Sequence, residues 1–199
     1  MRAIVESDCG IEVRAVLSDR ADAAGLAWAE ARGIEARAVA SEPGAGRAAH
    51  EARLVADIER LKPDYILLAG FMRILGEDLV QRYEGRMLNI HPSLLPAFPG
   101  LHTHRRALEA GVRLHGATVH FVTPSLDDGP IVAQAAVPVL DGDTEESLSA
   151  RVLAVEHRIY PKAVRWVAEG RVELGSGKRV RVRGIEAPAD RIEAPREAT

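Results

Sequence analysis

The chain has 199 residues, of which 47% are hydrophobic and 28% are charged, and its formal net charge is −3. This length suits one domain with a substantial core, and the mildly acidic balance lacks the basic stripe typical of nucleic-acid-binding proteins. No apolar run approaches the roughly 20 residues that span a bilayer, and a single cysteine, Cys9, excludes an intramolecular disulfide framework. We therefore expect a cytoplasmic protein without nucleic-acid or membrane partners.

Short apolar runs alternate with helical patterns in the first third of the chain, which is typical of an α/β domain. In chain order, the pattern predicts a strand at 13–17, a helix at 22–32, a weak strand at 36–40, a helix at 47–62 and a strand at 65–69. The last of these is continuously apolar, as expected of a parallel strand that is covered on both faces.

The following part of the chain predicts three more strands and a long helix. The strands are expected at 87–91, 118–122 and 131–139, and the helix is expected to begin near Thr144. Asp143 and Glu146 stand at capping-box spacing at the start of this helix. Together, these elements predict an α/β fold with a mostly parallel central sheet.

From Gly175 onward, the composition changes to charged residues, proline and alanine. Basic residues alternate with valine at 178–183, which could form an edge strand, and the rest is interpreted as a mobile tail. We therefore expect one domain at 1–174 and a largely mobile tail at 175–199.

Asn89 and His91 alternate with apolar residues, so the predicted strand at 87–91 places both on one face at its carboxyl end. An amide beside an imidazole suits acyl transfer, because the amide N–H stabilises an oxyanion while the imidazole moves protons. On these two residues alone, the favoured interpretation is an ordinary strand end. Asp127 changes this only if it lies near His91, where a carboxylate would raise the pKa of the imidazole. The turn at 127–130 by itself indicates only a turn.

Three other patterns suggest ligands but favour simpler interpretations. Five histidines, at 91, 102, 104, 115 and 120, raise a metal hypothesis in which a strand presents His102 and His104. The usual zinc signatures are missing, so we expect no metal. The stretch at 44–49 matches G-x-G-x-x-A, but the acidic residue that a dinucleotide site needs falls inside a helix, at Glu59. The stretch at 175–178 resembles only the end of a P-loop.

Several motifs occur in order at fixed spacing. They are FMRIL at 71–75, LNIHPSLLP at 88–96, PGLHTH at 99–104, HGATVHFV at 115–122, LDDGP at 126–130 and EHRIYP at 156–161. Through these motifs, residues 1 to about 174 resemble the glycinamide-ribonucleotide formyltransferases. Methionyl-tRNA formyltransferases and formyltetrahydrofolate hydrolases share the Asn-x-His strand and the Asp-x-Gly-Pro turn, but PGLHTH and the EHRIYP helix are similar to the glycinamide-ribonucleotide branch.

The resemblance implies a Rossmann-like formyltransferase fold and a reaction in de novo purine biosynthesis. A formyl group would pass from 10-formyltetrahydrofolate to the amine of 5′-phosphoribosylglycinamide, without a metal or a covalent enzyme intermediate. Asn89 would donate to the oxyanion, His91 would shuttle protons, and Asp127 would keep His91 able to take a proton. Removing such an oxyanion donor typically costs about 2.7–4 kcal/mol. A homodimer is compatible with the resemblance.

The resemblance also places the ligands. The folate would contact an irregular segment, a loop and neighbouring side chains, namely Arg47, Met72, Arg73, Ile74, Leu75, Val80, Asn89, Thr123, Pro124, Ser125, Leu126 and Asp127. The nucleotide substrate would contact Gly100 and Glu156. For Glu156, sequence alone favours an exposed helix glutamate that pairs with Arg151 or Arg158.

The chain departs from this family at its start. The family begins with an apolar strand and a Ser-Gly-x-Gly-Ser-Asn-Leu loop that binds the substrate's phosphate, and residues 1–5 align with the helix directly after that loop. We therefore expect this strand and loop to be missing, through a reading frame that starts too late or a shortened protein. Neighbouring strands would then have unpaired edges, and the nucleotide half of the site would be impaired. Leu153 further weakens that half, because relatives commonly have a polar or basic residue there.

Three alternatives therefore stay open. Hydrolysis of 10-formyltetrahydrofolate would use the same three residues with water as the acceptor. A catalytically silent folate-binding or partner-binding fragment would bind folate without turnover. A histidine-metal hydrolase is the weakest alternative, and a metal analysis of the purified protein would exclude it.

Overall fold

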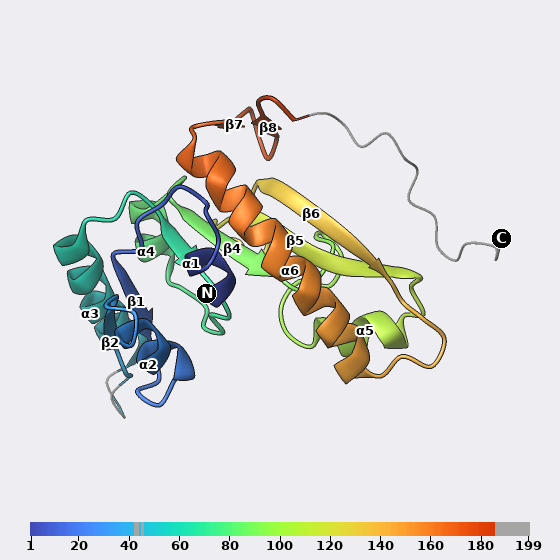
Figure 1. Ribbon diagram of the computed structural model, residues 1–199, viewed down its shortest axis with the longest axis horizontal. Helices are drawn as coiled ribbons and strands as arrows, with labels where there is room; N and C mark the ends of the chain where they lie inside the picture. Colours follow the sequence, from blue (N-terminus) through green and yellow to red (C-terminus); the bar gives the residue numbers. More distant parts are fainter. Residues whose placement is uncertain (42–43, 45, 186–199) are drawn as a thin grey trace.

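The computed structural model describes residues 1–41, 44 and 46–185, whose strands form three sheets flanked by helices (Figure 1). This arrangement confirms the predicted α/β class. The elements in chain order are α1 (Arg2–Val5), β1 (Ala15–Ser18), α2 (Ala24–Glu30), β2 (Glu35–Ala38), α3 (Gly46–Leu61), β3 (Ile66–Leu68), α4 (Glu77–Arg82), β4 (Met87–His91), α5 (Thr103–Glu109), β5 (Leu114–Phe121), β6 (Ile131–Pro138), α6 (Glu145–Ala168), β7 (Val172–Leu174) and β8 (Val180–Val182).

The central sheet has four strands in the order β3-β4-β5-β6. It is mixed rather than mostly parallel, because β3 and β4 pair in parallel while β4–β5 and β5–β6 pair antiparallel. The short connection between β5 and β6 explains the antiparallel pairing of these two strands, since a parallel pair needs a crossover of a dozen or more residues.

The long helix α6 runs across β5 and β6 and covers one face of the central sheet (Figure 1). Its apolar stripe begins with Leu148, Val152 and Val155, which pack against residues of β5 and β6. The residue that caps α6 is Thr144, whose hydroxyl accepts a hydrogen bond from the backbone N–H of Ser147. The predicted box of Asp143 and Glu146 is therefore wrong.

Asp143 has another role at the start of α6. Its carboxylate lies 2.7 Å from the Arg151 guanidinium and accepts a hydrogen bond from the Leu140 amide. The bidentate pairing with arginine explains why this carboxylate does not cap the helix, and it holds the pKa of Asp143 well below its usual range.

A second, two-stranded sheet contains β1 and β2, which pair in parallel. The predicted strands and helices between residues 13 and 69 are all present, with ends shifted by one or two residues. Within the described part of the chain, no backbone ladder joins β1 to β3. The α/β layer is therefore interrupted between β1 and β3.

Helices α4 and α5 and strand β7 were not predicted. Helix α5 corrects the expected strand at His102–His104, because His102 is the N-cap of α5 in a left-handed conformation and Thr103 is its first residue.

The predicted edge strand at 178–183 is confirmed as β8, which pairs antiparallel with β7. Residues 186–199 of the predicted tail, and Ala45 of the predicted glycine loop, lie outside the described residues. No helix in the described ranges is long and apolar enough to cross a membrane.

Candidate active site

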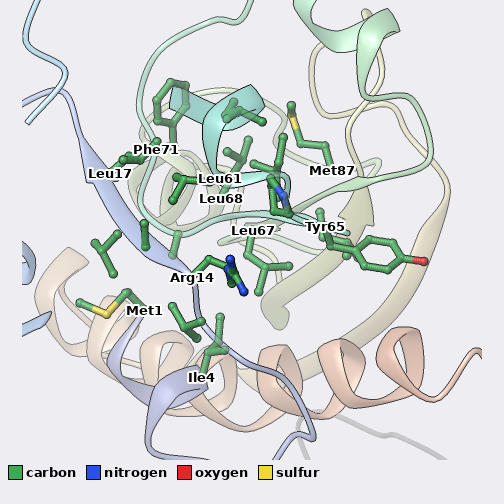
Figure 2. Close-up of a pocket in the computed structure, with 18 of the residues that line it drawn as sticks. Met1, Ile4, Arg14, Leu17, Leu61, Tyr65, Leu67, Leu68, Phe71 and Met87 are labelled. Carbon is green, nitrogen blue, oxygen red and sulfur yellow. The ribbon is translucent and has the colours of Figure 1, made fainter. Parts of the chain in front are cut away.

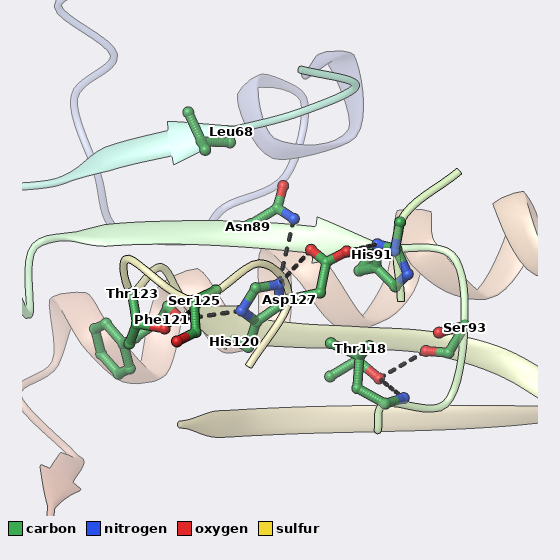
Figure 3. A network of polar contacts seen from close by, with 12 residues as sticks. Leu68, Asn89, His91, Ser93, Thr118, His120, Phe121, Thr123, Ser125 and Asp127 are labelled. Atoms are coloured by element: carbon green, nitrogen blue, oxygen red, sulfur yellow. Dashed lines mark hydrogen bonds and ion pairs between the residues drawn. The ribbon is translucent and has the colours of Figure 1, made fainter. Parts of the chain in front are cut away.

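Strand β4 brings Asn89 and His91 to one face of the central sheet at the strand's carboxyl end, as predicted. The antiparallel register places Asn89 opposite His120 and His91 opposite Thr118 on β5. Paired residues of neighbouring strands share a face, so these four side chains line one surface (Figure 3). His120 and Thr118 had no predicted role in this site.

Asp127 reaches this surface from the turn that follows β5. Its Oδ2 lies 3.4 Å from His91 Nδ1, and its Oδ1 lies 3.8 Å from His120 Nε2. The backbone N–H of Gly100 donates to the same carboxylate at 2.8 Å. The side chains of His91 and Asp127 are only 7% and 9% exposed. The structure therefore meets the condition on which the acyl-transfer hypothesis depends, the proximity of Asp127 to His91.

Both ring nitrogens of His91 face acceptors. Its Nε2 lies 3.0 Å from the carbonyl oxygen of Phe98, and its Nδ1 faces the Asp127 carboxylate. Only the imidazolium donates to both at once, because a neutral ring has a single N–H. For His91 to give a proton to a ligand, a ligand atom must replace one of these two acceptors. The contact with Asp127, at 3.4 Å, is longer than the contact with Phe98 and is therefore the one more easily replaced.

His120 orients the amide of Asn89. His120 Nδ1 donates to the Phe121 carbonyl at 2.9 Å, so its Nε2 is the acceptor for the Asn89 Nδ2 group at 3.3 Å. Burial lowers the pKa of His120, which keeps the ring neutral in this role. The amide keeps a second Nδ2 hydrogen that can donate to a ligand. Polar and apolar residues alternate in 118–122 as they do in 87–91. Pairing these two predicted strands was the sequence signal that could have identified His120.

A buried hydrogen-bond network supports the loop after β4. The Thr118 hydroxyl donates to the Ser93 carbonyl at 2.7 Å and accepts from the Leu95 amide at 3.0 Å. Gln134 Nε2 donates to Thr118 Oγ1 and to the Leu95 carbonyl. These contacts hold the segment that leads to Phe98, the acceptor for His91.

The turn that carries Asp127 lies directly against β5. A Cβ atom on Gly129 would stand 1.8 Å from the Phe121 carbonyl oxygen, which no side chain tolerates without movement of the backbone. Asp127 itself has a left-handed φ of 50°. Glycine at 129 is thus required for the close approach that brings the carboxylate to His91.

The residues assigned to folate lie partly on the surface. Met72 and Ile74 are 77% and 63% exposed, and Leu126 in the loop before Asp127 is also exposed. Exposed apolar side chains beside a polar cluster are typical of a ligand-binding surface. Val80, by contrast, is only 2% exposed within α4, so it lies behind this surface.

The two arginines of the same set have partners in the protein. Arg73 pairs with Asp19 at 2.6 Å. Arg47 lies 3.8 Å from Glu51, whose carboxylate accepts from the Gly76 amide at 2.6 Å. Glu51 therefore links the start of α3, where Arg47 lies, to the chain just after residues 72–75.

The nucleotide residues are not brought together. Gly100 holds Asp127 through its amide, whereas Glu156 lies on α6. Burial raises the pKa of Glu156 to about 6. In the part of the chain that the structure describes, no hydrogen bond or ion pair joins Glu156 to Asn89, His91 or Asp127. Its expected pairing with Arg151 is wrong, because Arg151 pairs with Asp143.

Two further histidines, His104 and His115, form a pair beside the site. His104 Nδ1 lies 3.2 Å from His115 Nε2, so one ring donates to the other. Burial, reinforced by the neighbouring His104, lowers the pKa of His115 to about 4. In the described ranges, no group of three or more His, Cys, Asp or Glu residues could hold a metal ion. That no metal is needed stays a prediction.

Comparisons with known proteins agree with this geometry. Residues 1–164 match the family model described as formyl transferase. The chain is 51% identical to the phosphoribosylglycinamide formyltransferase of Escherichia coli over 162 residues, which are 81% of this chain and 76% of that protein.

Solved structures give the same picture. Glycinamide ribonucleotide transformylase 1 from Symbiobacterium toebii is 51% identical, with a TM-score of 0.81 over 84% of this chain and 79% of that chain. A formyltetrahydrofolate deformylase from Pseudomonas syringae is more distant, at 30% identity and a TM-score of 0.80 over 86% of this chain and 56% of that chain.

Proposed function

The chain belongs to the formyl transferase family, and we propose that it transfers the formyl group of 10-formyltetrahydrofolate to the amine of 5′-phosphoribosylglycinamide. The observation that carries this proposal is the convergence of Asn89, His91 and Asp127 at the carboxyl end of β4. Half of the residues are identical to those of the E. coli formyltransferase over most of both chains, which supports the same chemistry.

Asn89 and His91 stabilise the developing charge in this mechanism. The substrate amine attacks the formyl carbon, a new N–C bond forms, and the carbonyl oxygen becomes an oxyanion. The free Nδ2 hydrogen of Asn89 donates to that oxygen, and His91 adds positive charge beside it when the ring carries the proton that it transfers. His120 contributes by holding the Asn89 amide in the donating orientation.

Asp127 and His91 manage the protons. The attacking nitrogen loses a proton, and N10 of the folate gains one as its bond to the formyl carbon breaks. His91 passes this proton after a ligand atom replaces its loose contact with Asp127, whose carboxylate stabilises the charged ring. No covalent bond to the protein is required.

The two substrates bind on either side of this group in the proposal. The exposed side chains of Met72, Ile74 and Leu126 cover the faces of the folate ring, while backbone groups of residues 72–75 and 123–127 bind its edge. The nucleotide binds toward Glu156 and the loop at Gly100. Because Gly100 uses its amide on Asp127, we assign it the placement of that carboxylate.

Hydrolysis of the same donor is the less favoured candidate. The deformylase neighbour is 30% identical, against 51% for the phosphoribosylglycinamide formyltransferase, and no feature of the site distinguishes water as the acceptor.

A spectroscopic assay of tetrahydrofolate release, with and without phosphoribosylglycinamide, tests the proposal. Release that requires the nucleotide supports the transferase. Equal release without the nucleotide would identify a hydrolase. Binding of 10-formyl folate without any turnover would identify a folate-binding protein and refute the enzymatic proposal.

A further inference from the structure

The turn that carries Asp127 has a second carboxylate, Asp128, which the proposed mechanism does not use. Asp127 faces His91 and accepts from the Gly100 amide. Asp128 instead pairs with the ammonium group of Lys178, which lies in the loop between β7 and β8. Two neighbouring carboxylates therefore connect one turn to two different parts of the protein.

The turn is closed firmly at its base and loosely at its tip, around Asp127. At the base, the Phe121 amide donates to the Pro130 carbonyl at 2.9 Å. Within the turn, the Asp128 amide donates to the Ser125 carbonyl at 3.4 Å, which is long for such a hydrogen bond. Asp127 has a left-handed backbone, a conformation that non-glycine residues keep only where their surroundings hold it. Contacts from outside the turn therefore decide how firmly its tip is held.

The hairpin of β7 and β8 is fixed at both ends. Its loop is closed by the Gly175 amide, which donates to the Arg179 carbonyl at 2.8 Å. At its base, the Arg183 amide donates to the Arg171 carbonyl at 2.9 Å, and the Arg171 guanidinium donates to the Arg183 carbonyl at 2.8 Å. Lys178 lies within the closed loop, so its side chain starts from an ordered backbone.

The hairpin also packs beside the strands that enter and leave the turn. Val172 and Val182 pack against the apolar cluster that contains Phe121 and Val132. Phe121 is the last residue of β5 and Val132 is the second residue of β6, so the cluster holds both strands that the turn connects. Strand β8 lies beside β6 (Figure 1). Apolar packing thus fixes the hairpin on these strands, and the ion pair extends this support to the tip of the turn.

We propose that Lys178 is a positioning residue: its pair with Asp128 holds the tip of the turn and so keeps the Asp127 carboxylate beside His91. This inference rests on the proposed function, because it concerns the carboxylate that stabilises the charged His91 ring. The side chains of Lys178 and Asp128 are 61% and 49% exposed, so their pair adds little to global stability. Catalysis is more sensitive, because a misplacement of about 1 Å can cost about 10²-fold in rate.

Lys178→Met tests the proposal, because it removes the ammonium group and keeps a long side chain. The turn is loosened rather than displaced, so kcat of formyl transfer should fall about 3- to 10-fold. The Tm and the KM for phosphoribosylglycinamide should not change. Lys178→Arg keeps the ion pair and should restore most of kcat. An unchanged kcat in Lys178→Met, or a loss that Lys178→Arg shares, would overturn the proposal.

Arg181→Met is the matched control. It removes a cation from β8 of the same hairpin, and in residues 1–41, 44 and 46–185 no hydrogen bond or ion pair joins Arg181 to the turn. It should leave kcat unchanged. A loss of kcat equal to that of Lys178→Met would assign the effect to the charge of the hairpin and would overturn the proposal.

Asp128→Asn separates positioning from a long-range effect of charge. Lys178→Met removes a positive charge and Asp128→Asn removes a negative one, so an electrostatic effect on the charged His91 ring would change kcat in opposite directions. Loss of the contact instead lowers kcat in both variants, and the double variant should be no slower than the slower single variant. Opposite changes, or losses that add in the double variant, would overturn the proposal.

Hydrogen exchange of the full chain tests the contact without any need for activity. The Asp128 amide should exchange about 3- to 10-fold faster in Lys178→Met than in the native chain, and at the native rate in Lys178→Arg. The amide of Val119 in β5 serves as the internal reference. Faster exchange in a chain without formyl transfer would support the support of the turn by Lys178 and refute the proposed function alone. Unchanged exchange would overturn the proposal whatever the value of kcat.

Discussion

Two regions of the molecule differ in the interactions that stabilise them: the polar site at β4–β6, and the gap between strands β1 and β3. At β4–β6, hydrogen bonds and the contacts of Asp127 with His91 and His120 connect the polar residues and the loop after β4 into one group. At the gap, apolar side chains face a cavity of about 1240 Å³ (Figure 2), and strand edges have no ladder partner within the described chain. The comparison shows that the polar site can be fully connected while the sheet beside it is interrupted between β1 and β3.

Asp127→Asn tests the polar side of this comparison and should have the largest effect. The amide keeps an oxygen for the Gly100 N–H but loses the charge that stabilises the His91 imidazolium, so kcat should fall by about 10²–10⁴ with little change in Tm. The formyl-transfer assay measures this loss. Asp141→Asn, at a carboxylate that is 92% exposed, is the matched control. An Asp127→Asn enzyme with normal kcat would show that the polar site is not catalytic.

A pair of leucine truncations tests the packing on the two sides. Leu88 is fully buried in β4, so Leu88→Ala should lower the free energy of unfolding by about 2–5 kcal/mol. Leu67 is only partly buried beside the cavity, so Leu67→Ala should cost about 1 kcal/mol. Urea unfolding of both variants measures the difference. Equal costs would mean that the gap is closed in solution.

The two sides also differ in what the sequence could predict. Strand β4 matched its predicted range, because its alternation of apolar and polar residues is a local signal. The contacts of His91 with Asp127 and of Asn89 with His120 depend on register and on the close turn at Gly129, which join residues far apart in sequence. His120 was missed for that reason.

Elements with weak local signals were also missed. Helix α5 begins after a left-handed residue, His102, without a Ser, Thr, Asp or Asn cap, and its short length gave no periodic stripe. The capping residue of α6 was misplaced by one position, because Arg151 binds the Asp143 carboxylate, a contact that no local rule predicts. The motif resemblance, by contrast, identified the family that the comparisons confirm.

The smallest effect is expected at Glu156. Burial raises its pKa to about 6 from an ordinary 4.5, so the folded state holds a proton that the unfolded state releases between these values. Stability should therefore fall as pH rises from about 4.5 to 6. Glu156→Gln should remove this loss and gain about 1 kcal/mol above pH 7, measured by urea unfolding across pH. The exposed variant Glu109→Gln should show no such gain, and a pH-independent effect of Glu156→Gln would contradict the assignment.

The central claim is that the Asn89 amide stabilises the oxyanion of formyl transfer. Single-turnover transfer from 10-formyltetrahydrofolate to phosphoribosylglycinamide by Asn89→Ala tests it most directly. We expect a rate about 10²–10³ lower than that of the native chain, with an unchanged Tm. A rate equal to that of the native chain would contradict the claim and remove Asn89 from the mechanism.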